Sequence, residues 1–304
     1  MTLSVIIVNW NVKDLLRQCL QSVIASEIQG EVEIIVVDSA SGDGSAAMVR
    51  QEFPRIKLIA SDENLGYAKG NNIGAAQASG DYLFLLNPDT RLEADTLATL
   101  NAYLQAHPGV GALAPQLLWP DGSTQSSRRR FPTLATLFWE STLLHQWFPR
   151  NKFARAYHCD DISPAKTTRV DWAVGAALFI RRKAWEQVGG LDETLFMYFE
   201  ETDWQRRAAK AGWEVHYLPA AQVTHYEGQS SGQVFAARTI RFQRSKIRYT
   251  KKYFGKGWAL TLRFFLWLTF AFQWGEETVK WVVGHKRLLR RERMSAYLEV
   301  LKQI

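Results

Sequence analysis

The chain is poor in cysteine and proline and has no long uninterrupted apolar run. Its two cysteines among 304 residues cannot form a disulfide framework, and Cys19 falls in an apolar helical pattern that is typical of a buried, reduced thiol. Nine prolines and the lack of low-complexity tracts argue against disorder and collagen-like repeats. Residues 1–11 carry no basic leader and too few apolar residues for a signal peptide or a spanning helix. We therefore expect the body of the protein in a reducing compartment.

The residues that are present indicate one large domain followed by an appendage. Apolar residues make up 47% of the chain and charged residues 22%, which is typical of a globular protein. The charge is uneven, because residues 1–237 carry 21 Lys and Arg against 26 Asp and Glu, whereas residues 238–293 carry 15 against 3. We expect a domain over residues 1–235 and a basic, aromatic-rich helical region over residues 236–304.

The densest aromatic run of this basic region covers residues 258–274, where 13 of 17 residues are apolar. A helix of this length spans only about 25 Å, short of the roughly 30 Å hydrocarbon core, so a full crossing needs residues beyond Gly275. On a helical wheel the polar residues gather on one side, although Leu262, Leu266 and Phe270 also fall there. The polar residues on that side are Arg263, Gln273, Glu277 and Lys280.

This amphipathic, basic pattern predicts a helix that lies in the headgroup zone of an anionic membrane surface. The alternative is a helix packed on the domain with a solvated basic face. Nucleic acid is a weaker interpretation of the same charge, since no recognised nucleic-acid module accompanies it, and we expect none to bind.

Alternating strands and helices dominate the first part of the chain. Apolar runs predict strands, and apolar residues at helical spacing predict the helices between them. This order favours an α/β fold with an open, mainly parallel, Rossmann-like sheet flanked by helices. Further on, residues 172–181 and 213–218 are strand-like, and residues 115–168 show no assignable structure. The early strands are expected at residues 3–8, 32–37, 57–60 and 82–86, and the helices at residues 12–25, 45–53 and 68–78.

Polar residues end three of these strands. Asn9, Asp38 and Asp89 should converge on one crevice, because ligands of such sheets lie beyond the carboxyl ends of the strands. A carboxylate at Asp38 can accept a hydrogen bond from a base or a ribose hydroxyl, and Asp89 with substrate phosphates can hold Mg²⁺ or Mn²⁺. Each of these residues taken alone is more often a turn or helix cap.

Two further patterns carry candidate chemistry. Residues 64–74 pack three glycines and three asparagines around a helix start, which indicates close approach of the backbone either to a ligand or to the sheet. Glu200, Glu201 and Asp203 are neighbouring carboxylates, whose repulsion makes one of them a plausible general base, although acids also favour a helix first turn. His225 alone is more often structural than a ligand.

The order of these motifs is more specific than any one of them. Asn9-Trp10-Asn11, Asp38 with Ser41, Asn64-Leu65-Gly66-Tyr67, Asn87-Pro88-Asp89, Glu200-Glu201 and His225 follow one another along the chain. With Asp121-Gly122, this series resembles the family 2 inverting glycosyltransferases of the GT-A fold, and most closely a bacterial rhamnosyltransferase-like subgroup. The resemblance covers about residues 1–235.

The resemblance implies roles for individual residues. Asp89 takes the place of the last acid of the family's DXD-type motif and holds Mg²⁺ or Mn²⁺ with His225, while Asn87 replaces the first acid. Glu201 is the general base, with Glu200 and Asp203 as substitutes, and having Glu in place of the family's usual Asp is a departure. The nucleotide-binding residues are Asn9, Trp10, Asp38, Asn64, Gly66 and Asn71. The acceptor wall is formed by Trp172, Gly175, Ala176 and Arg128.

The implied activity is transfer of rhamnose or another hexose, with inversion, from a dTDP- or UDP-sugar to a hydroxyl of a lipid-linked or cell-envelope glycan acceptor. The basic region places this enzyme in the cytoplasm, peripheral to the inner face of the cytoplasmic membrane. One alternative is a catalytically inactive GT-A-fold scaffold or binding module at the membrane. Another is a processive polysaccharide synthase, which is disfavoured because a Gln-x-x-Arg-Trp motif and several spanning helices are missing.

Overall fold

The computed structural model describes residues 2–28, 30–140, 142–148, 151–227, 235–284 and 286–304. It divides into two compact units. The first comprises Met1–Phe131, His158–Phe196 and Glu200–Ser230. The second comprises Pro132–Tyr157, Met197–Phe199 and Ser231–Ile304, and so includes part of the stretch that the sequence left unassigned.

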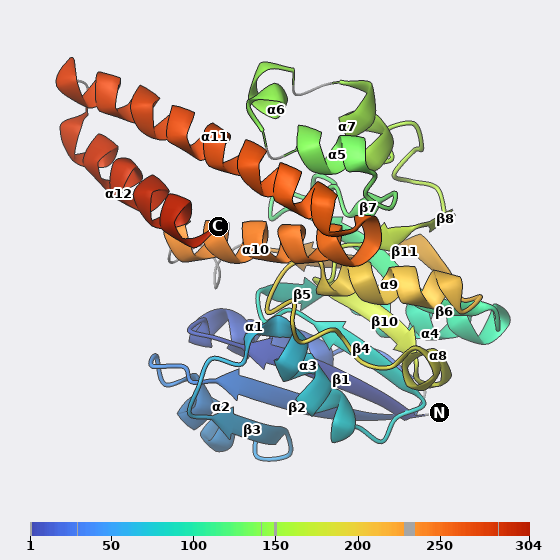
Figure 1. Cartoon of the computed structure of the whole chain (residues 1–304). Helices are drawn as coiled ribbons and strands as arrows, with labels where there is room; N and C mark the ends of the chain where they lie inside the picture. Colours follow the sequence, from blue (N-terminus) through green and yellow to red (C-terminus); the bar gives the residue numbers. More distant parts are fainter. Residues whose placement is uncertain (1, 29, 141, 149–150, 228–234, 285) are drawn as a thin grey trace. The chain divides into compact units, whose positions relative to one another are not determined.

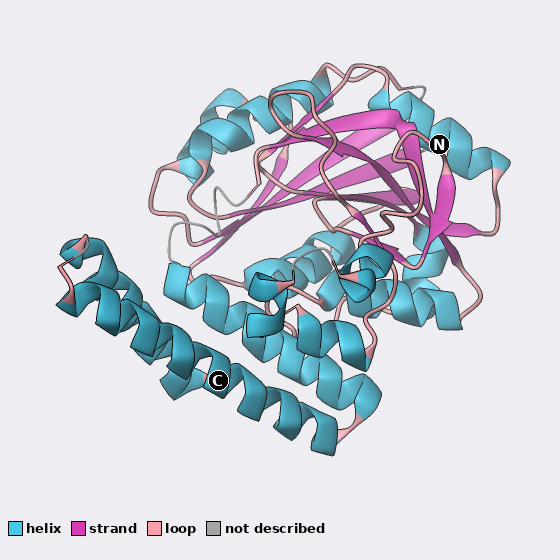
Figure 2. Ribbon diagram, turned by 90° about the horizontal axis from the view of Figure 1, so that it is seen from above, coloured by secondary structure: helices cyan, strands magenta, loops and turns pink. Residues whose placement is uncertain are grey.

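The first unit is built on a mixed sheet in which the described residues form nine strands (Figure 2). The order is β3-β2-β1-β4-β10-β6-β11-β5, with β8 also paired to β11. The first four strands are parallel and β6 is parallel to β11, whereas β10 runs antiparallel between β4 and β6. The strands are β1 (Thr2–Asn9), β2 (Glu31–Ser39), β3 (Lys57–Ser61), β4 (Tyr82–Leu86), β5 (Thr90–Leu92), β6 (Val110–Leu118), β8 (Thr168–Val170), β10 (Ala177–Arg181) and β11 (Glu214–His225).

The expected mainly parallel α/β sheet is confirmed, and two strand predictions need correction. The run over residues 172–181 is not one strand, because β9 (Trp172–Ala173) pairs with β7 (Arg128–Arg129) while β10 pairs with β4, and the chain turns between them. The strand expected at residues 213–218 continues to His225 through a register shift between Leu218 and Gln222. This extension brings His225 opposite Thr90 of β5.

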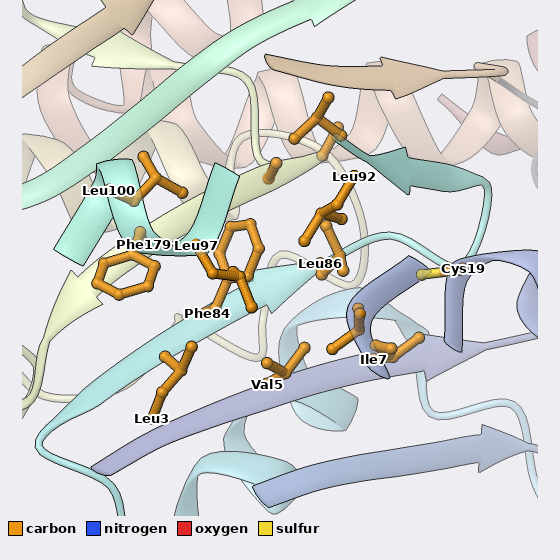
Figure 3. Close-up of a cluster of buried hydrophobic side chains, with 14 of the residues drawn as sticks. Leu3, Val5, Ile7, Cys19, Phe84, Leu86, Leu92, Leu97, Leu100 and Phe179 are labelled. Atoms are coloured by element: carbon orange, nitrogen blue, oxygen red, sulfur yellow. The ribbon is translucent and has the colours of Figure 1, made fainter. Parts of the chain in front are cut away.

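Side-chain alternation along β1 divides the core into two layers. Leu3, Val5 and Ile7 face one layer with Phe84 and Leu86 of β4 (Figure 3). This layer also contains the thiol of Cys19, which is free and buried as the sequence predicts. Burial raises the pKa of this thiol to about 12. The helices on this side are α1 (Lys13–Ile24), α2 (Ser45–Glu52) and α4 (Thr96–Ala106).

The opposite layer contains Ile6 of β1 and residues of three further helices. Here α3 packs so closely on β1 that a Cβ on Gly70 would lie 2.7 Å from Val8, and one on Gly74 would collide with Ile6. Close backbone packing on the sheet therefore explains these two glycines. The helices of this layer are α3 (Gly66–Ala76), α8 (Arg182–Val188) and α9 (Glu200–Lys210).

The second unit is helical in its described parts, and α11 and α12 pack side by side as a hairpin (Figure 1). Leu262, Leu266 and Phe270 are buried in the core of this unit, so the apolar residues on the polar side of the wheel pack against neighbouring helices. None of the helices that can be described is long and apolar enough to cross a membrane. The helices are α5 (Leu134–Trp139), α6 (Leu143–Trp147), α7 (Lys152–Tyr157), α10 (Phe235–Phe254), α11 (Lys256–Val282) and α12 (Arg287–Gln303).

Candidate active site

The ends of β1 and β2 bring Asn9 and Asp38 into direct contact. The two residues are register partners, and Asn9 Nδ2 donates to Asp38 Oδ2 at 2.9 Å and to Ser41 Oγ at 3.1 Å. The backbone N–H of Ser41 donates to Asp38 Oδ1 at 3.0 Å. Asn9 Oδ1 is buried and has no hydrogen-bond partner among the described residues. The sheet edge thus holds an oriented amide with a bare acceptor oxygen, while neighbouring Trp10 is partly exposed.

The start of α3 lies against the loop that precedes α9. Gly66 has φ +71°, and a Cβ there would come within 2.6 Å of the Phe196 carbonyl oxygen, so only glycine fits this position. Asn64 Oδ1 accepts from the Gly66 N–H at 3.0 Å. Asn71 Nδ2 donates to the Tyr67 carbonyl at 2.9 Å, which leaves its buried Oδ1 with no partner within the described part of the chain. Asn71 therefore offers a second oriented acceptor.

Asp89 and His225 meet although 136 positions separate them in the sequence. Asp89 Oδ1 lies 3.4 Å from His225 Nε2, and both side chains are about 6% exposed. The Tyr226 N–H donates to the Asp89 carbonyl at 2.9 Å, which fixes the loop after β4 to the end of β11. His225 Nε2 is buried and makes no hydrogen bond to a described residue. A carboxylate oxygen thus faces an unsatisfied ring nitrogen.

This pair is chemically suited to a divalent cation. Carboxylate oxygen and imidazole nitrogen are ligands that Mn²⁺ accepts, and Mg²⁺ is commonly held by one or two carboxylates with substrate phosphates. Among the described residues no group of three or more His, Cys, Asp or Glu side chains is arranged to hold a metal alone. A cation at Asp89 and His225 therefore needs further oxygens from a substrate.

Glu201 is held at the first turn of α9 beside the turn between β9 and β10. Its carboxylate accepts hydrogen bonds from the backbone N–H groups of Gly175, Glu201 and Thr202. Its Oε2 atom is buried and has no partner among the residues described. A Cβ added to Gly175 would lie 3.3 Å from the Glu201 side chain and 3.1 Å from the hydroxyl of Tyr67, so glycine permits this close approach.

Burial makes ionisation of Glu200 and Glu201, at the start of α9, less favourable than in water. Burial raises the pKa of Glu201, against the opposing effect of its backbone donors and Arg129. Burial and the adjacent Glu201 charge raise the pKa of Glu200 well above its ordinary value. Burial, followed by the charges of Glu200 and Glu201, raises the pKa of the Tyr67 hydroxyl well above its ordinary value. This hydroxyl donates a hydrogen bond to the Gly175 carbonyl at 2.6 Å. A carboxylate with a raised pKa is a stronger base near neutral pH.

One backbone hydrogen bond connects the cation pair to the candidate base. The Asn87 N–H, two residues before Asp89, donates to the Ala176 carbonyl at 2.8 Å. Ala176 follows Gly175, whose N–H contacts Glu201. Because β10 pairs directly with β4, the loops that carry Asp89 and Gly175 lie side by side.

Three other residues of the predicted site form hydrogen bonds or an ion pair with neighbouring protein groups. Arg128 is buried and donates to the carbonyls of Ile162 and Ser163 at 2.9 and 3.1 Å. Trp172 Nε1 donates to the Arg130 carbonyl at 2.9 Å. Asp203 is fully buried and pairs with Arg207 at 2.8 Å.

Two residues at the site were not predicted from the sequence to have a functional role. Tyr67 supports Gly175 through its hydroxyl, and Gln125 Oε1 lies 2.8 Å from His225 Nδ1. Tyr67 stands within the 64–74 motif and Gln125 follows the Asp121-Gly122 turn, so both were near a recognised pattern. Only the folded chain shows which side chains they contact.

Comparison with known proteins identifies the family. The family model for glycosyl transferase family 2 matches residues 4–170. The chain belongs to this family. It is 31% identical over 246 residues to N-acetylglucosaminyl-diphospho-decaprenol L-rhamnosyltransferase of Mycobacterium tuberculosis, covering 77% of this chain and 80% of that one. It is 27% identical over 255 residues to rhamnosyltransferase WbbL of Escherichia coli, covering 81% and 91%.

Solved structures confirm the GT-A fold of this glycosyltransferase. The mannosyltransferase PcManGT of Pyrobaculum calidifontis, in complex with GDP-Man and Mn²⁺, has a TM-score of 0.58 and 16% identity, covering 98% of this chain and 84% of that one. TarS 1-349 of S. aureus, in complex with UDP-GlcNAc, has a TM-score of 0.54 and 15% identity, covering 99% and 82%. The glycosyltransferase resemblance and the fold class expected from the sequence are thus confirmed.

Proposed function

We infer that this family 2 glycosyltransferase transfers a hexose, rhamnose being the leading candidate, from a dTDP- or UDP-sugar to a hydroxyl of a lipid-linked or cell-envelope glycan. The observation that carries this proposal is the linkage of Asp89 and His225 to Glu201 through the paired strands β4 and β10. The identity to two rhamnosyltransferases, one named for a lipid-diphosphate-linked acceptor, supports the sugar and the acceptor class.

The donor nucleotide is assigned to the sheet edge at Asn9 and Asp38, with Trp10, Asn64, Gly66 and Asn71 nearby along the same motifs. Uracil and thymine present a ring N–H donor, and the buried amide oxygens of Asn9 and Asn71 supply acceptors that have no partner in the described chain. Asp38, held by Asn9 and Ser41, keeps acceptor capacity for a ribose hydroxyl.

Glu201 is assigned as the general base. It takes the proton from the acceptor hydroxyl, and the resulting oxygen attacks the anomeric carbon from the face opposite the nucleotide, so one displacement inverts the configuration. Asp89 and His225 would hold a Mg²⁺ or Mn²⁺ ion, which would neutralise charge on the departing nucleoside diphosphate. Glu200 is the alternative candidate for the base. Asp203 is disfavoured as the base because it pairs with Arg207.

The acceptor side is assigned to the turn between β9 and β10, with Trp172, Gly175 and Ala176. Arg128 lies on the paired strand β7, and its engagement with backbone carbonyls favours a role in shaping this wall. The second unit provides an anionic-membrane contact that brings the chain to lipid-linked acceptors at the inner face of the cytoplasmic membrane.

A donor-hydrolysis panel tests the proposal. Purified protein is incubated with dTDP- and UDP-linked hexoses with and without Mg²⁺ or Mn²⁺, and release of the nucleoside diphosphate is measured. We expect cation-dependent turnover of one donor and its loss in Asp89→Ala. The inactive scaffold would be favoured instead if the protein turned over no donor and if cells carrying Asp89→Ala or Glu201→Gln kept the wild-type phenotype.

A further inference from the structure

The turn at Asp121 and Gly122 has no role in the reaction described above, yet it is a well-formed hairpin. The Trp119 N–H donates to the Ser123 carbonyl at 2.8 Å, Gly122 has φ +81°, and the Ser123 N–H donates to Asp121 Oδ1 at 2.9 Å. After the turn the chain runs back along β6, where the Gln125 N–H donates to the Leu117 carbonyl at 2.8 Å. The hairpin therefore fixes the backbone of Gln125.

The orientation of the Gln125 side-chain amide is set by its two neighbours. Its Nε2 donates to Glu227 Oε2 at 3.0 Å, since a carboxylate accepts and the amide nitrogen can only donate. The amide oxygen then faces His225 Nδ1 at 2.8 Å. An oxygen acceptor at this position requires His225 to carry a proton on Nδ1.

A proton on Nδ1 leaves Nε2 of the neutral ring with its lone pair, aimed toward Asp89 Oδ1 at 3.4 Å. Two buried acceptors that face each other repel unless a positive charge lies between them. The ordinary alternative tautomer would place a proton on Nε2 and block that position. The Glu227–Gln125–His225 chain therefore keeps the metal-facing nitrogen available.

We propose that Gln125, oriented by Glu227 and by the Asp121-Gly122 hairpin, is a positioning residue that holds His225 in the Nδ1-protonated tautomer required for cation binding. This inference rests on the cation site of the proposed function. Outer hydrogen-bond partners of metal-binding histidines commonly contribute 10–100-fold to metal affinity. The same range is expected for Gln125.

The test compares wild type, Gln125→Met, Gln125→Glu and Gln116→Met. Gln125→Met keeps the side-chain volume but removes the acceptor. The Gln125→Glu variant restores an acceptor oxygen for Nδ1 and also carries Glu227→Gln, so that an amide donor rather than a second carboxylate faces the new glutamate. Gln116→Met is the matched control, because Gln116 stabilises the same hairpin through Thr124 at 2.9 Å and is expected to affect stability without affecting His225. Thermal unfolding of all four proteins reports on the fold.

Two measurements are made. Long-range ¹H–¹⁵N correlation of metal-free protein, with His225→Gln used to assign the signal, reports which ring nitrogen carries the proton. Titration with Mn²⁺ in the presence of UDP, followed by electron paramagnetic resonance, reports affinity. We expect a protonated Nδ1 and normal Mn²⁺ affinity in wild type, Gln125→Glu and Gln116→Met. In Gln125→Met the proton should move to Nε2, and Mn²⁺ binding should weaken by about 10–100-fold.

The outcomes separate this inference from the proposed function. Equal Mn²⁺ affinity in wild type and Gln125→Met, or a wild-type His225 with a bare Nδ1, would overturn the role of Gln125. Equal losses in Gln125→Met and Gln116→Met would also overturn it, by showing that only the hairpin matters. A wild-type chain with a protonated Nδ1 that bound no Mn²⁺ would instead overturn the cation site of the proposed function.

Discussion

At the scale of single residues, Glu201 is the side chain on which the assigned chemistry depends most. Glu201→Gln keeps the shape but cannot accept a proton, so turnover should fall about 10²–10⁴-fold at pH 7 with the fold retained. The measurement is the initial rate of sugar transfer, with circular dichroism as the control for folding. A greater loss in Glu200→Gln than in Glu201→Gln would move the assignment of the base to Glu200.

The pH dependence of the wild-type enzyme follows from the same residue. A general base works only when it is deprotonated, and burial raises the pKa of Glu201 above the ordinary glutamate value. The rate should therefore rise with pH through an acid limb that lies above about pH 4.3. A rate that stays flat down to the pH at which the protein unfolds would contradict this assignment.

Tyr67 holds the Gly175 backbone beside Glu201 through a single hydrogen bond from its hydroxyl. Tyr67→Phe leaves the Gly175 carbonyl without its donor at 2.6 Å, which should lower the free energy of unfolding by about 1–3 kcal/mol in urea titration. Turnover should also fall, because Gly175 positions Glu201. A variant as stable and as active as wild type would show that this hydrogen bond has no positioning role.

The sequence allowed individual site residues to be proposed but did not reveal their contacts. Asn9, Asp38, Asp89, Glu201 and His225 could be proposed because strand ends and motif order restrict where polar residues lie in such a fold. Their partners could not, because a contact such as that between Gln125 and His225 joins positions 100 residues apart. No local periodicity contains that information.

At the scale of elements, helix α3 shows how close packing overrides helix propensity. Gly74→Ala would favour an isolated helix by about 1 kcal/mol, but the new Cβ collides with Ile6, and such overpacking typically costs about 1–3 kcal/mol. We expect lower stability by thermal unfolding. Gly275→Ala is the control, since its Cβ meets nothing within 4 Å and should leave stability equal or higher.

A second element-scale prediction concerns the starts of α1 and α2. Asp43 accepts from the Lys13 N–H at 2.7 Å and from the Ser45 N–H at 3.0 Å, so one carboxylate caps two helices. Burial works against ionisation of Asp43, but these hydrogen bonds, with that of the Ser45 hydroxyl, hold its pKa below the ordinary value. Asp43→Ala should cost about 0.5–2 kcal/mol at neutral pH.

The lowered pKa of Asp43 determines how its contribution to the free energy of unfolding depends on pH. Because the folded-state pKa of Asp43 is lowered, its contribution is present above the unfolded-state pKa, about 3.9, and is lost as pH falls through the folded value. Urea titrations of wild type and Asp43→Ala at pH 7 and in acid should therefore converge as the pH falls. A stability difference that persists unchanged in acid would exclude this carboxylate as the cause.

Elements with strong periodicity could be predicted, whereas those that depend on long-range pairing could not. The strand expected at residues 82–86 is present as β4 because its run is wholly apolar. Residues 172–181 are also mostly apolar, yet they divide between β9 and β10 because they pair with different strands. The partner strand, rather than the local sequence, decides where such a run bends.

At the scale of the whole molecule, the proposed membrane contact rests on the charge and the exposed apolar residues of the second unit. Phe264, Trp267 and Leu268 of α11 are each more than 40% exposed, although neighbouring Leu262 and Leu266 are buried. Exposed basic side chains lie on α10, at the start of α11, and on or directly before α12, which suits an anionic lipid surface. These residues are Lys251, Lys252, Lys256, Lys286, Arg287, Arg291 and Arg293.

A triple variant tests this assignment without removing any element. Phe264→Ser, Trp267→Ser and Leu268→Ser together should reduce co-sedimentation with phosphatidylglycerol vesicles while leaving donor hydrolysis intact. Trp119→Ser, at an exposed tryptophan of the first unit, is the control and should sediment as wild type does. Wild-type protein should sediment less in high salt, and equal sedimentation of wild type and the triple variant would contradict the prediction.

The insertion of β10 beside β4 has a consequence for how this enzyme can change. In the proposed mechanism, main-chain pairing sets the spacing between the leaving-group side and the proton-accepting side, and point substitutions rarely alter such pairing. Preference for one sugar over another would depend on the side chains that line the sugar site, and substitutions can change these without changing the backbone pairing. Stereochemical outcome should therefore persist among relatives that differ in the sugar they transfer.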